Sequence, residues 1–323
     1  MLVALIPLYT FSFRGADRMF FNSNLTLVIR PLLVCVVFLI LYQGSIFYDF
    51  LPSSEGINQW QANIIKSEKY IYSQNSNSRI VLVGSSLTNN LSTNYFSSQV
   101  ANLGMSGGSA QTGLEIVRRK QTKPKLLLVE LNDTIGRKLD NKLISPLFHP
   151  LTSFLKLYFP MFRQEYRPTS VLIQYLENEY KQKSKMNVVR QDEKQVVNSD
   201  FRKKMIKELV ENRNAELDTQ QKQLITQQAE FIKAQITDLQ KEAVRVILFD
   251  IPGEPVVDNT IKQKQIRELL KSLFPKNSFE WLPELPNREW VTSDGIHLVQ
   301  SNARKYVLQL ETIIAQLLTE RTI

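Results

Sequence analysis

Three polar residues in two separate stretches of the chain are of the types that carry out acyl transfer. Ser86 stands in a Gly-Ser-Ser sequence directly after the apolar run 80–83, and Asp294 precedes His297 by three residues near the C-terminus. A serine hydroxyl can attack an ester carbonyl when an imidazole takes its proton and a carboxylate holds that imidazole in the correct tautomer. Because a spacing of three allows the carboxylate and the imidazole to lie on one side of a tight turn, the sequence predicts a nucleophile, its base and the acid that orients the base.

Two further stretches offer hydrogen-bond donors for the oxyanion that forms in such a reaction. The loop after residues 100–103 contains Gly104, Gly107 and Gly108, whose backbone can approach a ligand closely. Asn132 stands at the end of the next apolar run, and its side-chain amide can donate to a developing oxyanion. Each of these residues taken singly is more often a turn residue, and Ser is a common helix N-cap. Together with the nucleophile, base and acid they complete the set that acyl transfer needs.

The elements expected around these residues explain how they could meet. The sequence contains four strand-like segments, at residues 80–83, 100–103, 125–131 and 244–251, and the best of them are continuous apolar runs. Continuous rather than alternating runs are typical of strands in a parallel sheet that is covered on both faces. Because helical patterns lie between the runs, the sequence predicts a doubly wound α/β domain. Sites in such sheets form beyond the carboxyl ends of the strands, where Ser86, the glycines and Asn132 stand.

An insertion at about residues 140–243 interrupts this alternation. Its first half is apolar and broken by prolines, and we consider a lid, a membrane-surface contact and a part of the core as alternatives. Its second half has apolar residues at multiples of three to four positions: Phe201, Met205, Leu209, Leu217, Leu224, Phe231 and Leu239. This spacing predicts one long amphipathic helix, or two, packed on the sheet, with a partner-binding or coiled-coil role as the alternative.

An apolar stretch from about residue 25 to residue 47 has the length that a bilayer-spanning helix needs. Arg14 and Arg18 precede it, Arg30 lies near its start, and Asp49 follows it. The positive-inside rule therefore predicts a cytoplasmic N-terminus and a periplasmic or extracellular remainder. Because no clean small-residue cleavage pattern follows, the sequence favours a retained anchor over a removed signal peptide. A buried core helix is the alternative interpretation.

Composition limits the partners and cofactors that we expect. The prediction divides the chain into an anchor, residues 1–50, and one α/β domain, residues 51–323. The net charge of +9, from 40 basic and 31 acidic residues, favours anionic surfaces such as lipid headgroups or acidic glycans. We expect no nucleic-acid partner, because no basic run is interleaved with aromatic residues. Cys35 is the single cysteine and the two histidines lie far apart, so we predict neither a zinc site nor a cofactor.

The four blocks resemble the SGNH/GDSL hydrolase family, whose name lists Ser, Gly, Asn and His in this order. The resemblance covers about residues 78–135 and 244–310. It implies that Ser86 is the nucleophile, that His297 and Asp294 complete the catalytic set, and that the oxyanion hole consists of the Ser86 N–H, Gly107 and Asn132. Gly104 is the next choice for the glycine. The resemblance further implies a flavodoxin-like three-layer α/β/α sandwich with a parallel sheet.

The chain departs from the family pattern at two positions. Ser85 stands where the family usually has Asp, and Glu130 stands where it usually has Gly, so we expect a charged side chain that narrows or acidifies the pocket. With its single anchor, the chain also resembles extracytoplasmic SGNH-like proteins that work with membrane-bound O-acyltransferases. That resemblance implies an esterase or O-acetyltransferase acting on acyl groups of an envelope or exported polysaccharide.

Two other functions remain open at this point. One is a non-catalytic SGNH-like module that binds polymer or scaffolds a membrane-bound O-acyltransferase. The other is a lipase or lysophospholipase acting on a lipid substrate, with the apolar segment 143–162 as its lid.

Overall fold

The structure is a computed structural model of the 323-residue chain, and it describes residues 23–73, 79–97, 99–184, 197, 199–283 and 290–319. It divides into two compact units, Met1–Leu51 and Pro52–Ile323.

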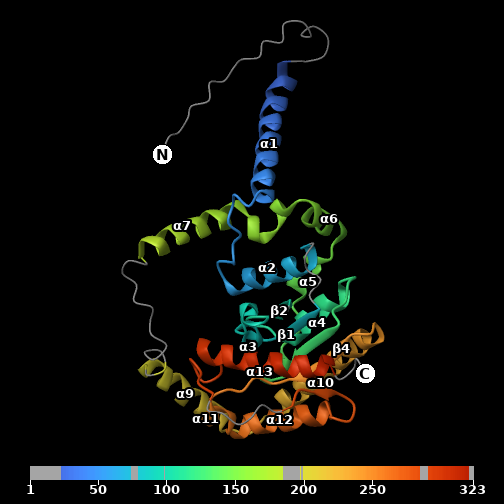
Figure 1. Ribbon diagram of the computed structural model, residues 1–323, viewed down its shortest axis with the longest axis vertical. Coiled ribbons are helices and arrows are strands. Elements are labelled where there is room, and N and C mark those ends of the chain that lie inside the picture. Colours follow the sequence, from blue (N-terminus) through green and yellow to red (C-terminus); the bar gives the residue numbers. More distant parts are fainter. Residues whose placement is uncertain are drawn as a thin grey trace. The chain divides into compact units, whose positions relative to one another are not determined.

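The first unit contains one long helix, α1 (Ser23–Phe47), which is labelled in Figure 1. Residues Val28–Phe47 have a mean hydropathy of 1.9, so this helix is long and apolar enough to cross a membrane. Pro31 lies inside the helix, two turns from its start. Arg14 and Arg18, on which the predicted topology depends, lie outside the described residues.

The second unit is built on a five-stranded sheet in which every pair of neighbouring strands is parallel. The order is β2-β1-β3-β4-β5, one of the two common doubly wound orders, and the order in which strands are added reverses between β1 and β3. The four predicted strands are present and the short β5 is additional. The strands are β1 (Ile80–Gly84), β2 (Val100–Gly104), β3 (Leu126–Glu130), β4 (Arg245–Phe249) and β5 (Glu280–Trp281).

Helices cover both faces of the sheet (Figure 1). Val81 and Val83 of β1 belong to the core cluster under one set of helices, whereas Leu82 belongs to the cluster on the opposite face. The first face is covered by α2 (Gln59–Tyr72), α4 (Ala110–Arg119), α10 (Thr219–Lys241) and α12 (Ile261–Leu273), and the second mainly by α13 (Gln300–Thr319). The predicted α/β class with a parallel sheet is therefore confirmed.

The insertion between β3 and β4 folds into helices. Its second half forms two, α9 (Asp200–Arg213) and α10, and α10 packs on the sheet. Its first half comprises α5 (Asn141–Leu147), α6 (Pro150–Tyr158), the short 3-10 helices η3 (Pro160–Phe162) and η4 (Gln164–Tyr166), and α7 (Pro168–Ser184). The remaining short elements are α3 (Ser86–Asn89), η1 (Thr93–Tyr95), η2 (Asp133–Gly136) and α11 (Pro255–Asp258).

The prediction of which face of α10 is buried is wrong, and the buried positions are offset from the predicted ones by about one residue. Of the seven predicted positions only Leu239 is buried, and Phe231 is 42% exposed. The buried stripe consists of Ile225, Ala229, Ile232, Ile236 and Leu239, at alternating steps of four and three. Leu224 and Phe231 each stand one residue before a buried isoleucine, Ile225 and Ile232.

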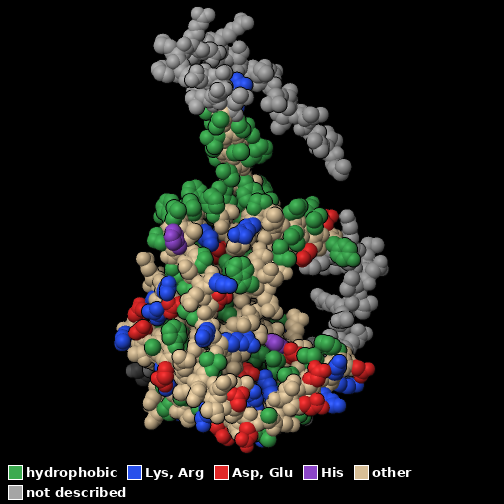
Figure 2. All heavy atoms as spheres, turned by 180° about the vertical axis from the view of Figure 1, so that it is seen from behind, with side chains coloured by type: hydrophobic (Ala, Val, Ile, Leu, Met, Phe, Trp, Pro, Cys, Tyr) green, Lys and Arg blue, Asp and Glu red, His purple; other side chains and the backbone are tan. Residues whose placement is uncertain are grey.

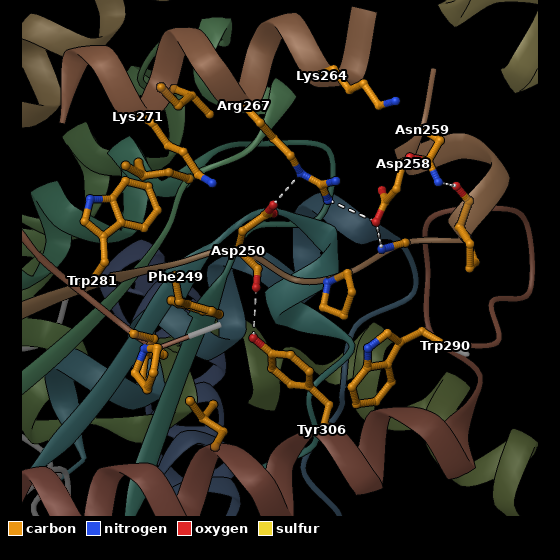
Figure 3. Close-up of a pocket in the computed structure, with 18 of the residues that line it drawn as sticks. Phe249, Asp250, Asp258, Asn259, Lys264, Arg267, Lys271, Trp281, Trp290 and Tyr306 are labelled. Atoms are coloured by element: carbon orange, nitrogen blue, oxygen red, sulfur yellow. Dashed lines mark hydrogen bonds and ion pairs between the residues drawn. The ribbon is translucent and has the colours of Figure 1, made fainter. Parts of the chain in front are cut away.

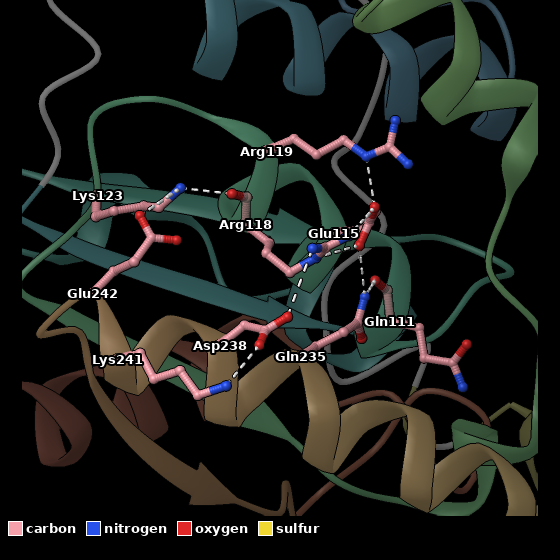
Figure 4. A network of polar contacts seen from close by, with 9 residues as sticks. All are labelled: Gln111, Glu115, Arg118, Arg119, Lys123, Gln235, Asp238, Lys241 and Glu242. Atoms are coloured by element: carbon pink, nitrogen blue, oxygen red, sulfur yellow. Dashed lines mark hydrogen bonds and ion pairs between the residues drawn. The ribbon is translucent and has the colours of Figure 1, made fainter.

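A polar network joins α10 to α4 beside this stripe (Figure 4). Glu115 of α4 is 2% exposed and accepts hydrogen bonds from Arg118, Arg119 and Gln235. The network satisfies a carboxylate that would otherwise be costly to bury. It fixes the insertion onto the sheet and so positions α9, which precedes α10.

Large hydrophobic side chains are exposed on α6, on η3 and on α7. Figure 2 shows green side chains gathered over this part of the unit. We name these residues the apolar surface: Leu151, Phe154, Leu157, Tyr158, Phe159, Phe162, Leu172, Ile173, Tyr175, Leu176 and Tyr180.

Candidate active site

The predicted nucleophile, Ser86, is the first residue of α3, and one residue, Ser85, separates it from β1. Ser85 caps this helix, because its Oγ accepts a hydrogen bond from the Leu87 N–H at 3.1 Å. Ser85 is 1% exposed, whereas Ser86 is half-buried. The two hydroxyls therefore differ in position: one supports the turn and the other is accessible from outside.

Two glycines allow the turn that carries Ser86 to pack tightly. A Cβ on Gly84 would lie 2.1 Å from a carboxylate oxygen of Glu130, and one on Gly104 would lie 2.3 Å from the backbone N of Asn89. Any larger side chain would force these segments apart. Gly104, the second choice for the oxyanion glycine, thus serves the close packing of β2 against α3.

The loop before α13 brings His297 to Ser86, the predicted nucleophile. His297 Nε2 lies 2.9 Å from Ser86 Oγ, and Nδ1 lies 2.6 Å from Asp294 Oδ2. The other Asp294 oxygen accepts hydrogen bonds from the N–H groups of Ile296 and His297, at 3.0 and 2.8 Å. Gly295 has a φ of +103°, a conformation that favours glycine and completes the tight turn. Ser86 therefore forms one continuous chain of contacts with His297 and Asp294, which lie more than two hundred positions later in the sequence.

The electrostatics of this chain of contacts suit a general base. Burial by itself would raise the pKa of the Asp294 carboxyl, but the hydrogen bonds from the His297 ring and from two backbone N–H groups lower it overall. An ionised carboxylate beside Nδ1 holds the proton on that nitrogen. The lone pair of Nε2 is then directed at the Ser86 hydroxyl.

Glu130 lies beneath the nucleophile turn and not in an open pocket. Its side chain is 3% exposed, and its carboxylate accepts hydrogen bonds from Ser85 N (2.7 Å), from Ser85 Oγ (3.0 Å) and from the Thr88 hydroxyl. Burial raises the pKa of this carboxyl, while the hydrogen bonds from Thr88 and Ser85 act in the opposite direction. The expectation that Glu130 narrows or acidifies the pocket is therefore wrong. It braces Ser85, the residue next to the nucleophile.

The two predicted oxyanion residues are placed differently. Asn132, 5% exposed, donates from Nδ2 to Glu130 and to Ser85 Oγ, the latter at 3.3 Å, so its amide lies one residue from the nucleophile. Gly107, with a φ of +73°, lines a hollow beside Trp60 and Arg137. No described hydrogen bond joins either residue to Ser86 itself.

Helix α9 holds the loop that carries His297 in place, a role that no sequence pattern indicated. Arg202 donates from Nε to the Thr292 carbonyl at 2.6 Å and from Nη2 to Glu254 at 2.8 Å. The Thr292 hydroxyl donates to the same Glu254 oxygen at 2.7 Å and accepts from the Gly295 N–H at 3.0 Å. These contacts connect the insertion to the turn that carries Asp294.

Replacing Arg202 by Ala is expected to cost about 2 kcal/mol of stability, because it removes charge-assisted hydrogen bonds from a largely buried group. For the acyl transfer that the sequence predicts, ester turnover should also fall about tenfold, since a loosened histidine loop misplaces the imidazole. Urea unfolding and kinetic assays measure the two effects. The matched control is Lys203→Ala, whose side chain is 67% exposed and pairs with an exposed Asp200. Equal effects in both variants would show that α9 does not hold the loop.

Arg213, at the end of α9, makes a similar contact on the other side of the site. It donates to Asp133 at 2.6 Å and to Gln263 at 2.7 Å. Asp133 follows Asn132 directly, so the insertion is connected to the end of β3 as well.

A separate hollow lies at the carboxyl end of β4 (Figure 3). Its accessible volume is about 530 Å³, and Trp281, Trp290 and Tyr306 are among its lining residues. Arg267 pairs there with Asp250 at 2.9 Å and with Asp258 at 3.0 Å. None of Ser86, Asp294 and His297 lines it. Within the described ranges, no group of three or more His, Cys, Asp and Glu residues could hold a metal ion.

Neither a scan against protein-family models nor searches of curated proteins and of solved structures gives a match.

Proposed function

We propose that the chain is a serine acyl-ester hydrolase or O-acyltransferase of the SGNH/GDSL type that works through an acyl-Ser86 intermediate. The observation that carries the proposal is the set of contacts from Ser86 Oγ through His297 to Asp294, at 2.9 and 2.6 Å. The parallel α/β sheet, with the serine two residues beyond the end of β1 and an Asn two residues beyond the end of β3, adds support.

The first half-reaction forms the acyl-enzyme. Ser86 Oγ bonds to the carbonyl carbon of an ester while its proton passes to His297 Nε2. The tetrahedral intermediate then collapses, the bond to the alcohol oxygen breaks, and the alcohol leaves with the proton from His297. Asp294 stabilises the imidazolium that exists between these steps.

The second half-reaction releases the acyl group. Water or a sugar hydroxyl attacks the acyl-Ser86 carbonyl and gives its proton to His297. The bond between the carbonyl carbon and Ser86 Oγ then breaks, and His297 returns the proton to Oγ. Water as the acceptor makes the protein an esterase, and a sugar hydroxyl makes it an O-acetyltransferase.

The Ser86 N–H, the Gly107 N–H and the Asn132 amide are the proposed oxyanion donors. Because the Asn132 amide already donates to Glu130 and to Ser85, an oxyanion would have to take over the longer of these bonds, the one to Ser85 Oγ. Each such donor typically contributes a hundredfold to a thousandfold in rate.

The proposed substrate is an acylated envelope or exported polysaccharide, with a membrane-bound O-acyltransferase as partner. The apolar helix α1 and the basic balance of the chain favour this interpretation. In the proposed topology the N-terminus is cytoplasmic, and the α/β unit is periplasmic or extracellular.

A non-catalytic binding or scaffolding module is the second candidate function. It is favoured by one observation, the Asn132 amide that is already engaged by Glu130 and Ser85. The lipase or lysophospholipase interpretation has less support, because Leu143, Ile144 and Leu147 of the supposed lid are packed in the core.

A fluorophosphonate probe separates the two candidates. We expect the folded full-length protein to react once, with the adduct on the peptide that contains Ser86, because the probe needs a serine activated by its base. Protein unfolded in urea is the matched control and should not react. If the folded protein stays unlabelled while remaining intact, the binding module is the better account.

A further inference from the structure

We propose that the apolar surface of α6, η3 and α7 lies flat in the headgroup region of the same bilayer that α1 spans. This role is independent of the acyl-transfer chemistry. In this proposal lipid covers the apolar surface, which the described part of the chain leaves exposed.

The exposed hydrophobic residues of the apolar surface are not scattered singly but follow one another at helical spacing. On α6, Leu151, Phe154 and Tyr158 follow at steps of three and four and are each more than half exposed. On α7, Leu172 and Leu176, 58% and 57% exposed, are one helical turn apart. Contiguous apolar patches of this kind on soluble proteins mark sites of contact with a membrane or another protein.

Helices α6 and α7 are firmly attached to the α/β unit, so loose attachment is not the reason that their apolar surface is exposed. Lys156 of α6 pairs with the buried Glu68 of α2 at 2.7 Å, and the same carboxylate accepts from Gln164 N at 2.6 Å. Gln61 of α2 donates to Ser170 of α7 at 2.8 Å. The polar sides of both helices are thus fixed on α2, which leaves their apolar sides outward.

The length of the chain keeps this surface near the membrane. The apolar span ends at Phe47, and seven residues later the Ser54 N–H donates to the Glu165 carbonyl at 2.9 Å. Glu165 belongs to η4, the element between α6 and α7. Since an extended chain covers at most about 3.5 Å per residue, η4 cannot lie more than about 25 Å from the end of the span.

The residue types favour lipid over a protein partner. Tyr158, Tyr175 and Tyr180 join the aliphatic side chains, and tyrosine is enriched where a protein meets the headgroup region. Arg167, exposed between η4 and α7, can extend its guanidinium to lipid phosphates while its stem stays on the apolar face. Amphipathic helices with these features lie in the plane of the interface.

The single cysteine of the chain makes the proposal directly testable. In a Cys35→Ser background of the full chain, a nitroxide is attached at Phe154→Cys or at Leu176→Cys. The protein is reconstituted into vesicles of phosphatidylethanolamine and phosphatidylglycerol. The matched control is Leu308→Cys on α13, an exposed leucine outside the apolar surface (49% exposed). The measurement is the accessibility of each label to oxygen and to a water-soluble nickel complex.

We expect labels at 154 and 176 to be accessible to oxygen but to lose accessibility to nickel, whereas the label at 308 stays accessible to nickel. Nickel accessibility at all three positions would overturn the proposal, because the surface would then be in water. Labels at 154 and 176 that are shielded from both reagents would also overturn it, because they would report a protein contact such as a second copy. Neither result depends on turnover at Ser86, which a soluble ester measures separately.

Discussion

Ser86→Ala and His297→Ala are each expected to lower kcat/KM for p-nitrophenyl acetate by about ten-thousandfold or more, and the double variant should be no worse than either single one. The reason is that nucleophile and base act as a unit, so that removing one makes the other useless. Asp294→Asn should lower turnover by about a thousandfold to ten-thousandfold, because the imidazole loses the partner that holds its tautomer. Steady-state kinetics on all four proteins measure these effects.

The control for this prediction is Ser272→Ala, which removes an exposed hydroxyl on α12 and should leave turnover unchanged. Circular dichroism and unfolding midpoints test whether each variant keeps the fold. Losses that add in the double variant would contradict a shared role. Full activity in Ser86→Ala would eliminate the acyl-Ser86 intermediate.

Glu130→Ala is expected to reduce stability by on the order of 3 kcal/mol and to reduce fluorophosphonate labelling of Ser86 strongly. The variant leaves the donors of Ser85, Thr88 and Asn132 without their acceptor inside the protein, and unsatisfied buried groups are costly. The turn that holds Ser86 would then lose its support. Chemical unfolding and the labelling rate measure the two effects.

The pH dependence of stability provides a second measurement on Glu130. Its pKa in the folded protein lies above the ordinary value of 4.5, so the folded state binds the proton more tightly than the unfolded state does. The free energy of unfolding that this group contributes is therefore complete below 4.5 and decreases as the pH rises above it. Glu130→Gln should show a smaller decrease over that range. An identical pH profile would contradict the raised pKa.

A paired exchange tests how specific this arrangement is. Where the family pattern has Asp, this chain has Ser85, and where the pattern has Gly, it has Glu130; here the two side chains are hydrogen-bonded to each other. We expect Ser85→Asp to recover labelling when it is added to Glu130→Gly. The double variant again has a carboxylate beside the turn that carries Ser86, supplied by position 85 after β1 instead of by position 130 at the end of β3. Ser85→Asp alone should be harmful, since it places two buried carboxylates together. A double variant no better than Glu130→Gly would show that position as well as charge matters.

The sequence predicted the framework because the signals for it are local. Continuous apolar runs such as 80–83 and 126–129 are typical of strands inside a parallel sheet, and the strand ends then place Ser86 and Asn132 at one edge of the sheet. The length and composition of α1 likewise follow from consecutive residues. Asp294 and His297 were found because they lie three residues apart.

Other features depended on contacts between residues distant in the chain, which no local pattern records. Glu130 looked like a charge in the pocket, but its carboxylate is turned inward because donors from Ser85 and Thr88 satisfy it there. Arg202 resembled any basic residue on a solvated helix until α9 was placed against Thr292 and Glu254.

The buried side of α10 was mispredicted for a related reason. Its hydrophobic residues occupy more than one face, and only packing against α4 and the sheet selects Ile225 and Ile232 over Leu224 and Phe231.

The sequence by itself thus determined which residue types stand at the strand ends and that one helix is apolar enough for a membrane. The tertiary structure decided that Ser86 and His297, 211 positions apart, lie within hydrogen-bond distance. It also decided that the apolar surface of α6, η3 and α7 is exposed in the described part of the chain. The physical reason is that local propensity acts over a few residues, whereas the burial and pairing of polar groups are settled only when distant segments compete for the same core.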